Sequence, residues 1–135
     1  MKVTLDTNVL ISATHWPTSV AHKLFLELIR RNVEMVTTQA ILSEFTEVLV
    51  RDFNYQNHEV EQASGKMLAA VKIIESPSRV NIVHDDPDDN KIIECAIDSF
   101  SDYILTYDNH LLVLKEFQGI KIIKPEDFLR IELID

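Results

Sequence analysis

Four acidic residues are spaced along the chain so that folding could bring them to one site. Two of them follow predicted strands, the third lies in the first turn of a predicted helix, and the fourth borders the apolar face of another helix. In that order they are Asp6, Asp108, Asp89 and Glu44. The carboxyl ends of parallel strands lie along one edge of an open sheet, where ligands bind. Acidic side chains that are far apart in the sequence can therefore converge there.

Converging carboxylates would form a site for hard divalent cations. Carboxylates that lie close together repel one another, and one or more must take up a proton unless a cation is bound. Mg²⁺ and Mn²⁺ prefer oxygen ligands, and two such ions can activate a water and stabilise the leaving oxygen of a phosphodiester. Taken singly, each acid also has a structural explanation, as a helix cap, a turn residue or a solvated helix residue. The prediction of a metal site therefore rests on the four residues together.

The elements that must position these acids alternate between short β-branched runs and amphipathic stretches, which is typical of an α/β fold with a mostly parallel sheet. Strands are predicted at residues 3–5, 34–37, 80–83, 103–106 and 120–123. Helices are predicted at residues 20–29, 41–49, 60–74, 92–100 and 111–117, with a short final helix from Pro125. His15 and Trp16 are expected in a loop before the first helix. We therefore expect residues 1–135 to form a single three-layer α/β domain with a central sheet flanked by helices.

Length and composition exclude several classes of protein. With 135 residues, of which 46% are apolar and 26% charged, the chain has the size and balance of one globular domain. It has no apolar run of about 18 residues, so we expect no membrane span, and its start is too soon acidic for a signal peptide. The single Cys95 excludes an internal disulfide and a multi-cysteine zinc site, and it fits a cytoplasmic protein.

The net charge of −9 argues against a nucleic-acid partner, because a negative surface repels phosphate. Acids that are collected in one pocket are an exception. Divalent cations bound to such a pocket neutralise its charge and then attract phosphate. The position of the acids therefore matters more than their number.

Four segments of the chain resemble, in order and spacing, those of the PIN-domain nucleases. They are residues 5–11, 43–45, 86–96 and 102–108, and the tail at 122–128 is similar to the family's last strand and closing helix. The Asp-Pro-Asp-Asp-Asn run at residues 86–90 looks most like the toxins of prokaryotic toxin–antitoxin pairs (VapC-like). This resemblance implies an endoribonuclease that cleaves single-stranded RNA with Mg²⁺ or Mn²⁺. It also implies a homodimer and an antitoxin protein as partner.

The resemblance assigns roles to individual residues. The positions of the family's catalytic and metal-binding acids are occupied by Asp6, Glu44, Asp89 and Asp108. Asn8 and Thr106 are expected to support the site by orienting the carboxylates or a metal-bound water. The acidic turn leaves the metal ligand open among Asp86, Asp88 and Asp89. Tyr107 departs from the glycine that is frequent in this subgroup, and such a bulky residue would narrow access to the site.

A function of another class is a non-catalytic α/β binding or regulatory domain with an acidic metal pocket, including a receiver-like domain that accepts a phosphoryl group. Thr106 and Lys124 fit a receiver domain, which also needs an acceptor such as Asp52 at the end of a strand. The residues before Asp52 fit one helical face better than a strand. A metal titration separates the two classes, because a catalytic pocket should be stabilised by Mg²⁺ or Mn²⁺ and Asp6→Asn should remove that gain.

Overall fold

Within residues 1–84 and 86–132, which the computed structural model describes, six strands form one central sheet in the spatial order β3-β2-β1-β4-β6-β5. The strands are β1 (Lys2–Leu5), β2 (Glu34–Thr37), β3 (Val71–Ile73), β4 (Tyr103–Leu105), β5 (Glu116–Phe117) and β6 (Ile120–Ile123). All neighbouring strands are parallel except β5 and β6, which are antiparallel. The expectation of a mostly parallel sheet is therefore confirmed.

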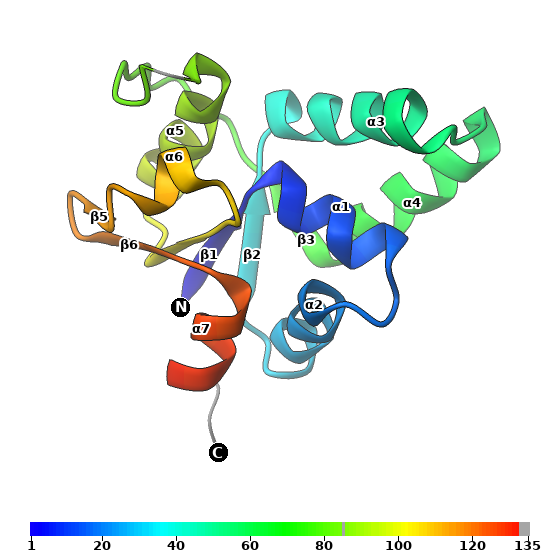
Figure 1. Cartoon of the computed structure of the whole chain (residues 1–135), viewed down its shortest axis with the longest axis horizontal. Helices are drawn as coiled ribbons and strands as arrows, with labels where there is room; N and C mark the ends of the chain where they lie inside the picture. Colours follow the sequence, from blue (N-terminus) through cyan, green and yellow to red (C-terminus); the bar gives the residue numbers. More distant parts are fainter. Residues whose placement is uncertain (85, 133–135) are drawn as a thin grey trace.

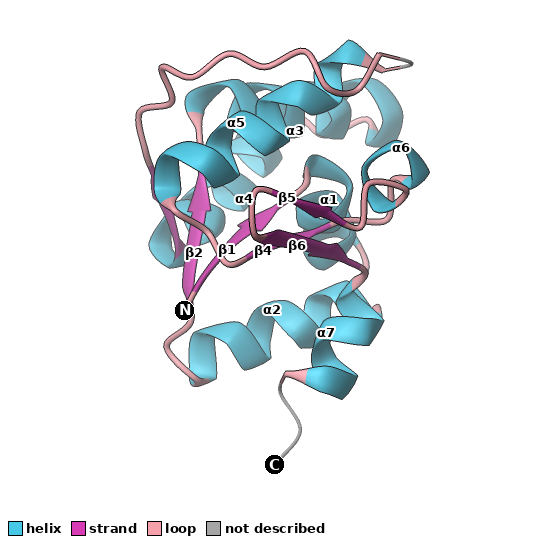
Figure 2. Cartoon of the chain, turned by 90° about the vertical axis from the view of Figure 1, so that its left-hand side faces the viewer, coloured by secondary structure: helices cyan, strands magenta, loops and turns pink. Residues whose placement is uncertain are grey.

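Helices cover both faces of this sheet, which makes three layers (Figures 1 and 2). The helices are α1 (Thr7–His15), α2 (Val20–Arg30), α3 (Gln39–Phe53), α4 (Asn57–Ala70), α5 (Asn90–Ser99), α6 (Asn109–Leu112) and α7 (Pro125–Ile131), with a 3₁₀ turn, η1 (Pro87–Asp89). Helices α3 and α5 lie on one side of the sheet, and α2 and α7 lie on the other (Figure 2). None of the helices in the described ranges is long and apolar enough to cross a membrane.

The central strands β1, β2 and β4 are buried along most of their length, and most of their residues are apolar. Every residue of β4 is buried, and so are the last three residues of β1 and β2. This is the pattern of parallel strands that are covered by helices on both faces. Several helices start where a polar side chain caps them, as Ser19 does for α2 and Thr38 for α3.

Helix α1 was not expected, because no helix was predicted before residue 20, and His15 and Trp16 were expected in a loop. Asp6 caps this helix, and its carboxylate accepts a hydrogen bond from the Thr7 backbone N–H. The apolar residues of α1 are buried on several sides, since the helix packs against both α2 and α3. A helix that is apolar all round lacks the amphipathic period by which helices are predicted. His15 is therefore the last residue of α1, while Trp16 lies in the connection to α2.

Two further expectations about secondary structure were wrong. The predicted helix 60–74 ends at Ala70, and Val71–Ile73 forms the edge strand β3, which pairs with β2. The predicted helix 111–117 is divided into the short α6 and the edge strand β5, which pairs with β6. In both cases pairing with another strand, β2 or β6, decides the structure, although the local apolar spacing favours a helix.

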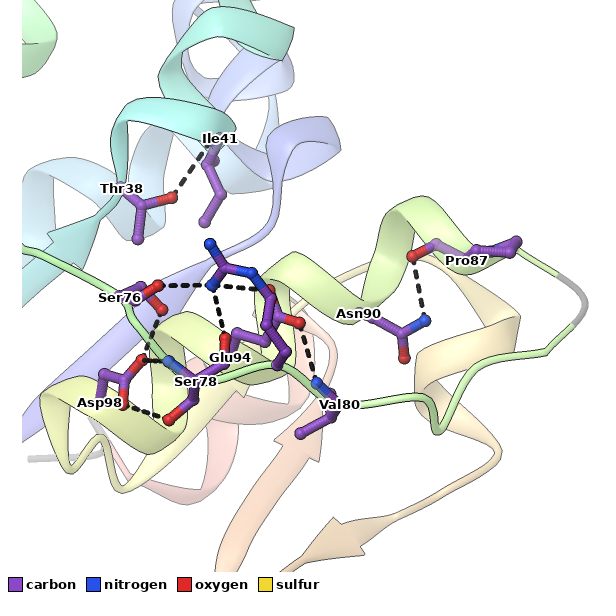
Figure 3. Close-up of polar contacts among 10 residues, drawn as sticks. Thr38, Ile41, Ser76, Ser78, Val80, Pro87, Asn90, Glu94 and Asp98 are labelled. Carbon is purple, nitrogen blue, oxygen red and sulfur yellow. Dashed lines mark hydrogen bonds and ion pairs between the residues drawn. The ribbon is translucent and has the colours of Figure 1, made fainter.

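The predicted strand 80–83 does not form, and side chains of α5 bind this segment instead (Figure 3). Glu94 Oε2 accepts a hydrogen bond from the Val80 backbone N–H at 3.0 Å. Asp98 accepts hydrogen bonds from the backbone N–H and the hydroxyl of Ser78, at 3.0 Å and 2.5 Å. These backbone groups are satisfied without a neighbouring strand, so the segment crosses α5 as an extended loop.

Candidate metal centre

The first acid of the site, Asp6, is held by hydrogen bonds at the junction of β1 and α1. It is buried, with 4% of its surface exposed. One carboxylate oxygen accepts from the Thr7 backbone N–H and the other from the Thr106 hydroxyl, both at 2.6 Å. Thr106 directly follows β4, the neighbour of β1 in the sheet. Its hydroxyl oxygen also accepts a hydrogen bond from the Asp108 backbone N–H at 2.9 Å, so Thr106 fixes Asp6 relative to Asp108.

The surroundings of Asp6 disfavour its charged form. Burial raises the pKa of Asp6 to about 6, and the negative charges of Asp108 and Glu44 add to this increase. The hydrogen bonds from Thr106 and Thr7 act in the opposite direction but do not compensate for burial. Asp6 is therefore a carboxylate that a nearby cation would stabilise.

A second group of side chains lies where η1 and α6 meet the same edge of the sheet. Ligand atoms of Asp86, Asp89, Asp108 and His110 all lie within 4.8 Å of one another. Asp108 caps α6 by accepting from the His110 backbone N–H at 2.8 Å, and His110 Nδ1 lies 3.5 Å from the same carboxylate oxygen. Sequence reasoning missed His110. The available signal was its position two residues after Asp108, in the first turn of the helix that Asp108 caps.

Asp89 is the most constrained member of this group. It is 8% exposed, and its Oδ2 has no hydrogen-bond partner among the described residues. The pKa of Asp89 is raised to about 8, and burial is the largest cause. Hydrogen bonding with Asp108 also raises this pKa, as do the negative charges of Asp6, Asp108 and Asp86. A buried carboxylate oxygen without a partner costs free energy.

The turn that carries Asp86 and Asp89 is fixed by Asn90, the first residue of α5. Asn90 Oδ1 accepts from the backbone N–H groups of Ile82 and Val83 at 3.0 Å and 2.9 Å. Its Nδ2 donates to the carbonyls of Val83 and Pro87 at 3.3 Å and 3.0 Å, the latter shown in Figure 3. Both ends of this amide are used, so the acidic turn is anchored before any ligand binds.

These residues fit a divalent cation. The donor set is three carboxylates and one imidazole, and one oxygen of Asp89 has no hydrogen-bond partner among the described residues. Mg²⁺ and Mn²⁺ favour such oxygen-rich sets. A positive ion here would offset the repulsion that raises the pKa values of Asp6 and Asp89.

Glu44 lies beside the acidic group rather than within it. It projects from α3, and its Oε2 lies 2.6 Å from the ammonium of Lys91 on α5. Its charge still contributes to the raised pKa of Asp6. Of the four acids that were predicted to converge, the structure places Asp89 and Asp108 in the four-residue group, with Asp6 and Glu44 outside it.

The remaining predicted residues have different surroundings. Asn8 is exposed, and its Oδ1 accepts from the Tyr107 backbone N–H at 3.4 Å, so it contacts the loop after β4 and not a carboxylate. The Tyr107 hydroxyl donates to Glu126 at 2.5 Å, and this hydrogen bond joins the loop to α7. Burial and the bond to Glu126 raise the pKa of Tyr107. Asp88 is exposed and outside the four-residue group, which contains Asp86 instead. Asp85 lies outside the described residues.

The receiver-like alternative lacks its acceptor. Asp52 is on α3, and it is exposed and paired with the neighbouring Arg51. Residues 47–50 belong to the same helix, so no strand leads to Asp52.

Comparison with known proteins identifies the family. The PIN-domain family model matches residues 2–110, a range that contains all four predicted acids. Among curated proteins, none matches this chain. The crystal structure of VapBC2 from Rickettsia felis, bound to a DNA fragment from their promoter, contains a chain of similar fold. Its TM-score is 0.66 at 15% identity, over 90% of this chain and 97% of that one. At this identity the likeness shows the fold, whereas the family match covers most of the sequence, and this chain therefore belongs to the PIN-domain family.

Proposed function

We propose that this chain, as a single domain over residues 1–135, is an endoribonuclease that cleaves single-stranded RNA and depends on a divalent metal. The observation that carries this proposal is the convergence of Asp86, Asp89, Asp108 and His110, with the buried Asp89 among them. Carboxylates that converge repel one another, and a bound divalent cation removes that repulsion. The function of PIN-domain nucleases supplies the reaction class.

The roles of the site residues follow from their contacts. Asp89 and Asp108, with Asp86 beside them, hold Mg²⁺ or Mn²⁺, and Asp6 and Glu44 add negative charge to the pocket. When bound, the ion supplies the charge that activates water and stabilises a phosphodiester as it is cleaved. Hydrogen bonds to both oxygens of Asp6 fix the position of this carboxylate, and its negative charge is stabilised once the cation is bound. Thr106 keeps that charge in register with Asp108.

The net charge of −9 shapes how the substrate binds. RNA is repelled by the empty pocket and attracted once the carboxylates are neutralised. Metal loading therefore precedes substrate binding, and RNA affinity should depend on the metal concentration. An RNA substrate places this activity in the cytoplasm.

The toxin of a toxin–antitoxin pair is the cellular role that we propose. Its supports are the acidic run at residues 86–90 and the fold shared with a chain of VapBC2. In this role the chain forms a homodimer, and a basic segment of an antitoxin protein enters the acidic pocket and blocks it. Truncating the basic segment of a co-purifying protein should relieve inhibition, and unchanged inhibition would contradict this role.

The test is cleavage of a mixed panel of single-stranded RNAs with Mn²⁺, Mg²⁺ or EDTA. The proteins are the wild type, Asp89→Asn, and Asp88→Asn as a matched control, because Asp88 is the exposed acid in the same turn. We expect metal-dependent cleavage by the wild type and by Asp88→Asn, and none by Asp89→Asn. Equal cleavage by all three proteins would contradict the proposal. If none cleaves RNA while Mn²⁺ still stabilises the wild type, the chain is a non-catalytic domain that binds metal.

A further inference from the structure

An ion pair between Lys91 and Glu44 joins α5 to α3 beside the acidic pocket. The Nζ–Oε2 distance is 2.6 Å, and the two side chains are 20% and 32% exposed. The pair is therefore partly buried. Ionic contacts in such a setting are stronger than on an open surface. In the described part of the chain, two of the predicted site acids lie beside a basic side chain. Asp108 lies beside His110, and Glu44 pairs with Lys91.

Glu44 needs such a partner to stay near the pocket. Its side chain has three rotatable bonds, and its charge is repelled by the neighbouring Asp6, whose pKa it helps to raise. Without a counter-charge, a partly exposed glutamate would turn toward water, where its charge is better solvated. The negative charge of Asp6 therefore repels Glu44 from the pocket, and the ion pair with Lys91 opposes that repulsion.

Lys91 is itself fixed by its position in the chain. It follows Asn90, whose amide makes three hydrogen bonds to the backbone of residues 82–83 and one to the Pro87 carbonyl. It lies two residues after Asp89, at the start of a helix that packs against α3. The pocket carboxylate of Asp89, its anchor Asn90 and the cation that holds Glu44 are therefore consecutive residues at the junction of η1 and α5.

We propose that Lys91 is a positioning residue, which holds Glu44 at the edge of the pocket so that this carboxylate contributes to divalent-cation binding. The proposal rests on the proposed metal-dependent function and adds a determinant of metal affinity that is not an acid. It also accounts for a basic residue in a pocket that should attract cations.

The sign of the change in metal affinity separates positioning from simple electrostatics. A nearby positive charge repels a divalent ion, so removal of the Lys91 charge should tighten metal binding if charge alone matters. If Lys91 positions Glu44, its removal should weaken binding, because the carboxylate is lost from the pocket. Residues that orient metal ligands typically contribute about 10-fold or more to metal affinity.

The experiment is a titration of the full chain with Mn²⁺, followed by the electron paramagnetic resonance of the free ion. The variants are Lys91→Met, Lys91→Arg, Glu44→Gln and the double variant Lys91→Met with Glu44→Gln. Lys66→Met is the control, because it removes the same charge from an exposed site on α4, away from α5 (Figure 1). Thermal unfolding without metal reports whether each variant is folded.

We expect Lys91→Met and Glu44→Gln to weaken Mn²⁺ binding by a similar factor of about 10, and the double variant to be no weaker than either one. Lys91→Arg should retain most of the affinity, and Lys66→Met should match the wild type. Unchanged or tighter binding by Lys91→Met, alongside weaker binding by Glu44→Gln, would overturn the positioning role. If the wild type binds no Mn²⁺, the proposed function fails, and the role of Lys91 fails with it.

Discussion

Replacement of Asp89 by asparagine should change how the stability of the metal-free protein depends on pH. The substitution keeps the shape of the side chain and removes its ability to ionise. Asp89 Oδ2 has no hydrogen-bond partner in the described chain, so the new amide nitrogen displaces no donor. The difference between the two proteins therefore reports mainly on ionisation.

The size of the effect follows from the pKa of Asp89. Burial and the neighbouring acids raise it from 3.8 to about 8 in the folded chain. Between about pH 5 and pH 7 the folded chain therefore keeps a proton that the unfolded chain has released, and stability must fall as the pH rises. One such proton lowers the free energy of unfolding by about 1.4 kcal/mol for each pH unit, or about 3 kcal/mol over this range. Asparagine removes this contribution. The loss of stability that remains is due to Asp6, whose pKa is raised to about 6.

The assay is urea denaturation in EDTA at several pH values across this range, with Asp88→Asn as the matched control. We expect the wild type and Asp88→Asn to lose stability together as the pH rises, and Asp89→Asn to lose less. Added Mn²⁺ should reverse the trend for the wild type, since the ion binds the ionised carboxylates and its affinity rises with pH. Parallel pH profiles for the wild type and Asp89→Asn would refute the assignment of the raised pKa to Asp89.

Three further substitutions test how the pocket and its frame are held. Thr106→Val removes the hydroxyl that donates to Asp6, so it should destabilise the protein by about 1–3 kcal/mol and weaken Mn²⁺ binding. Thr106→Ser keeps the hydroxyl and should have neither effect. Urea denaturation measures the stability, and Mn²⁺ titration measures the affinity. Asn90→Ala should speed amide hydrogen exchange at Ile82 and Val83, because both N–H groups lose their acceptor. Phe100→Gly should raise the free energy of unfolding by about 1 kcal/mol, because this residue is 83% exposed and has a φ of 58°, which favours glycine. An unchanged or lower stability of Phe100→Gly would show that the exposed ring contributes more than its backbone strain costs.

The choice of candidate acids could be made from the sequence because each acid stands at a recognisable local boundary. Asp6 and Asp108 follow buried apolar runs, and Asp89 follows a proline that opens a turn. Such boundaries depend on residues within a few positions along the chain, so they are visible without tertiary structure. The same local signals predicted four helices well, α2, α3, α5 and α7, and placed four strands.

Local signals failed where distant parts of the chain determine the outcome. Helix α1 was missed because it is buried by both α2 and α3, and the strand β3 was missed because only its pairing with β2 makes it a strand. The expected strand 80–83 is absent because Glu94 and Asn90 bind its backbone. In each case the partner is a tertiary neighbour that the local pattern does not specify.

The sequence by itself determined the α/β fold and a set of candidate acids at strand ends and helix starts, because apolar periodicity and strand ends are local properties. Only the tertiary structure decided which oxygen atoms lie close together. It grouped Asp86 and His110 with Asp89 and Asp108, and it paired Glu44 with Lys91. Distances between side chains on different elements depend on how helices pack on the sheet, and that packing is decided by the whole core at once.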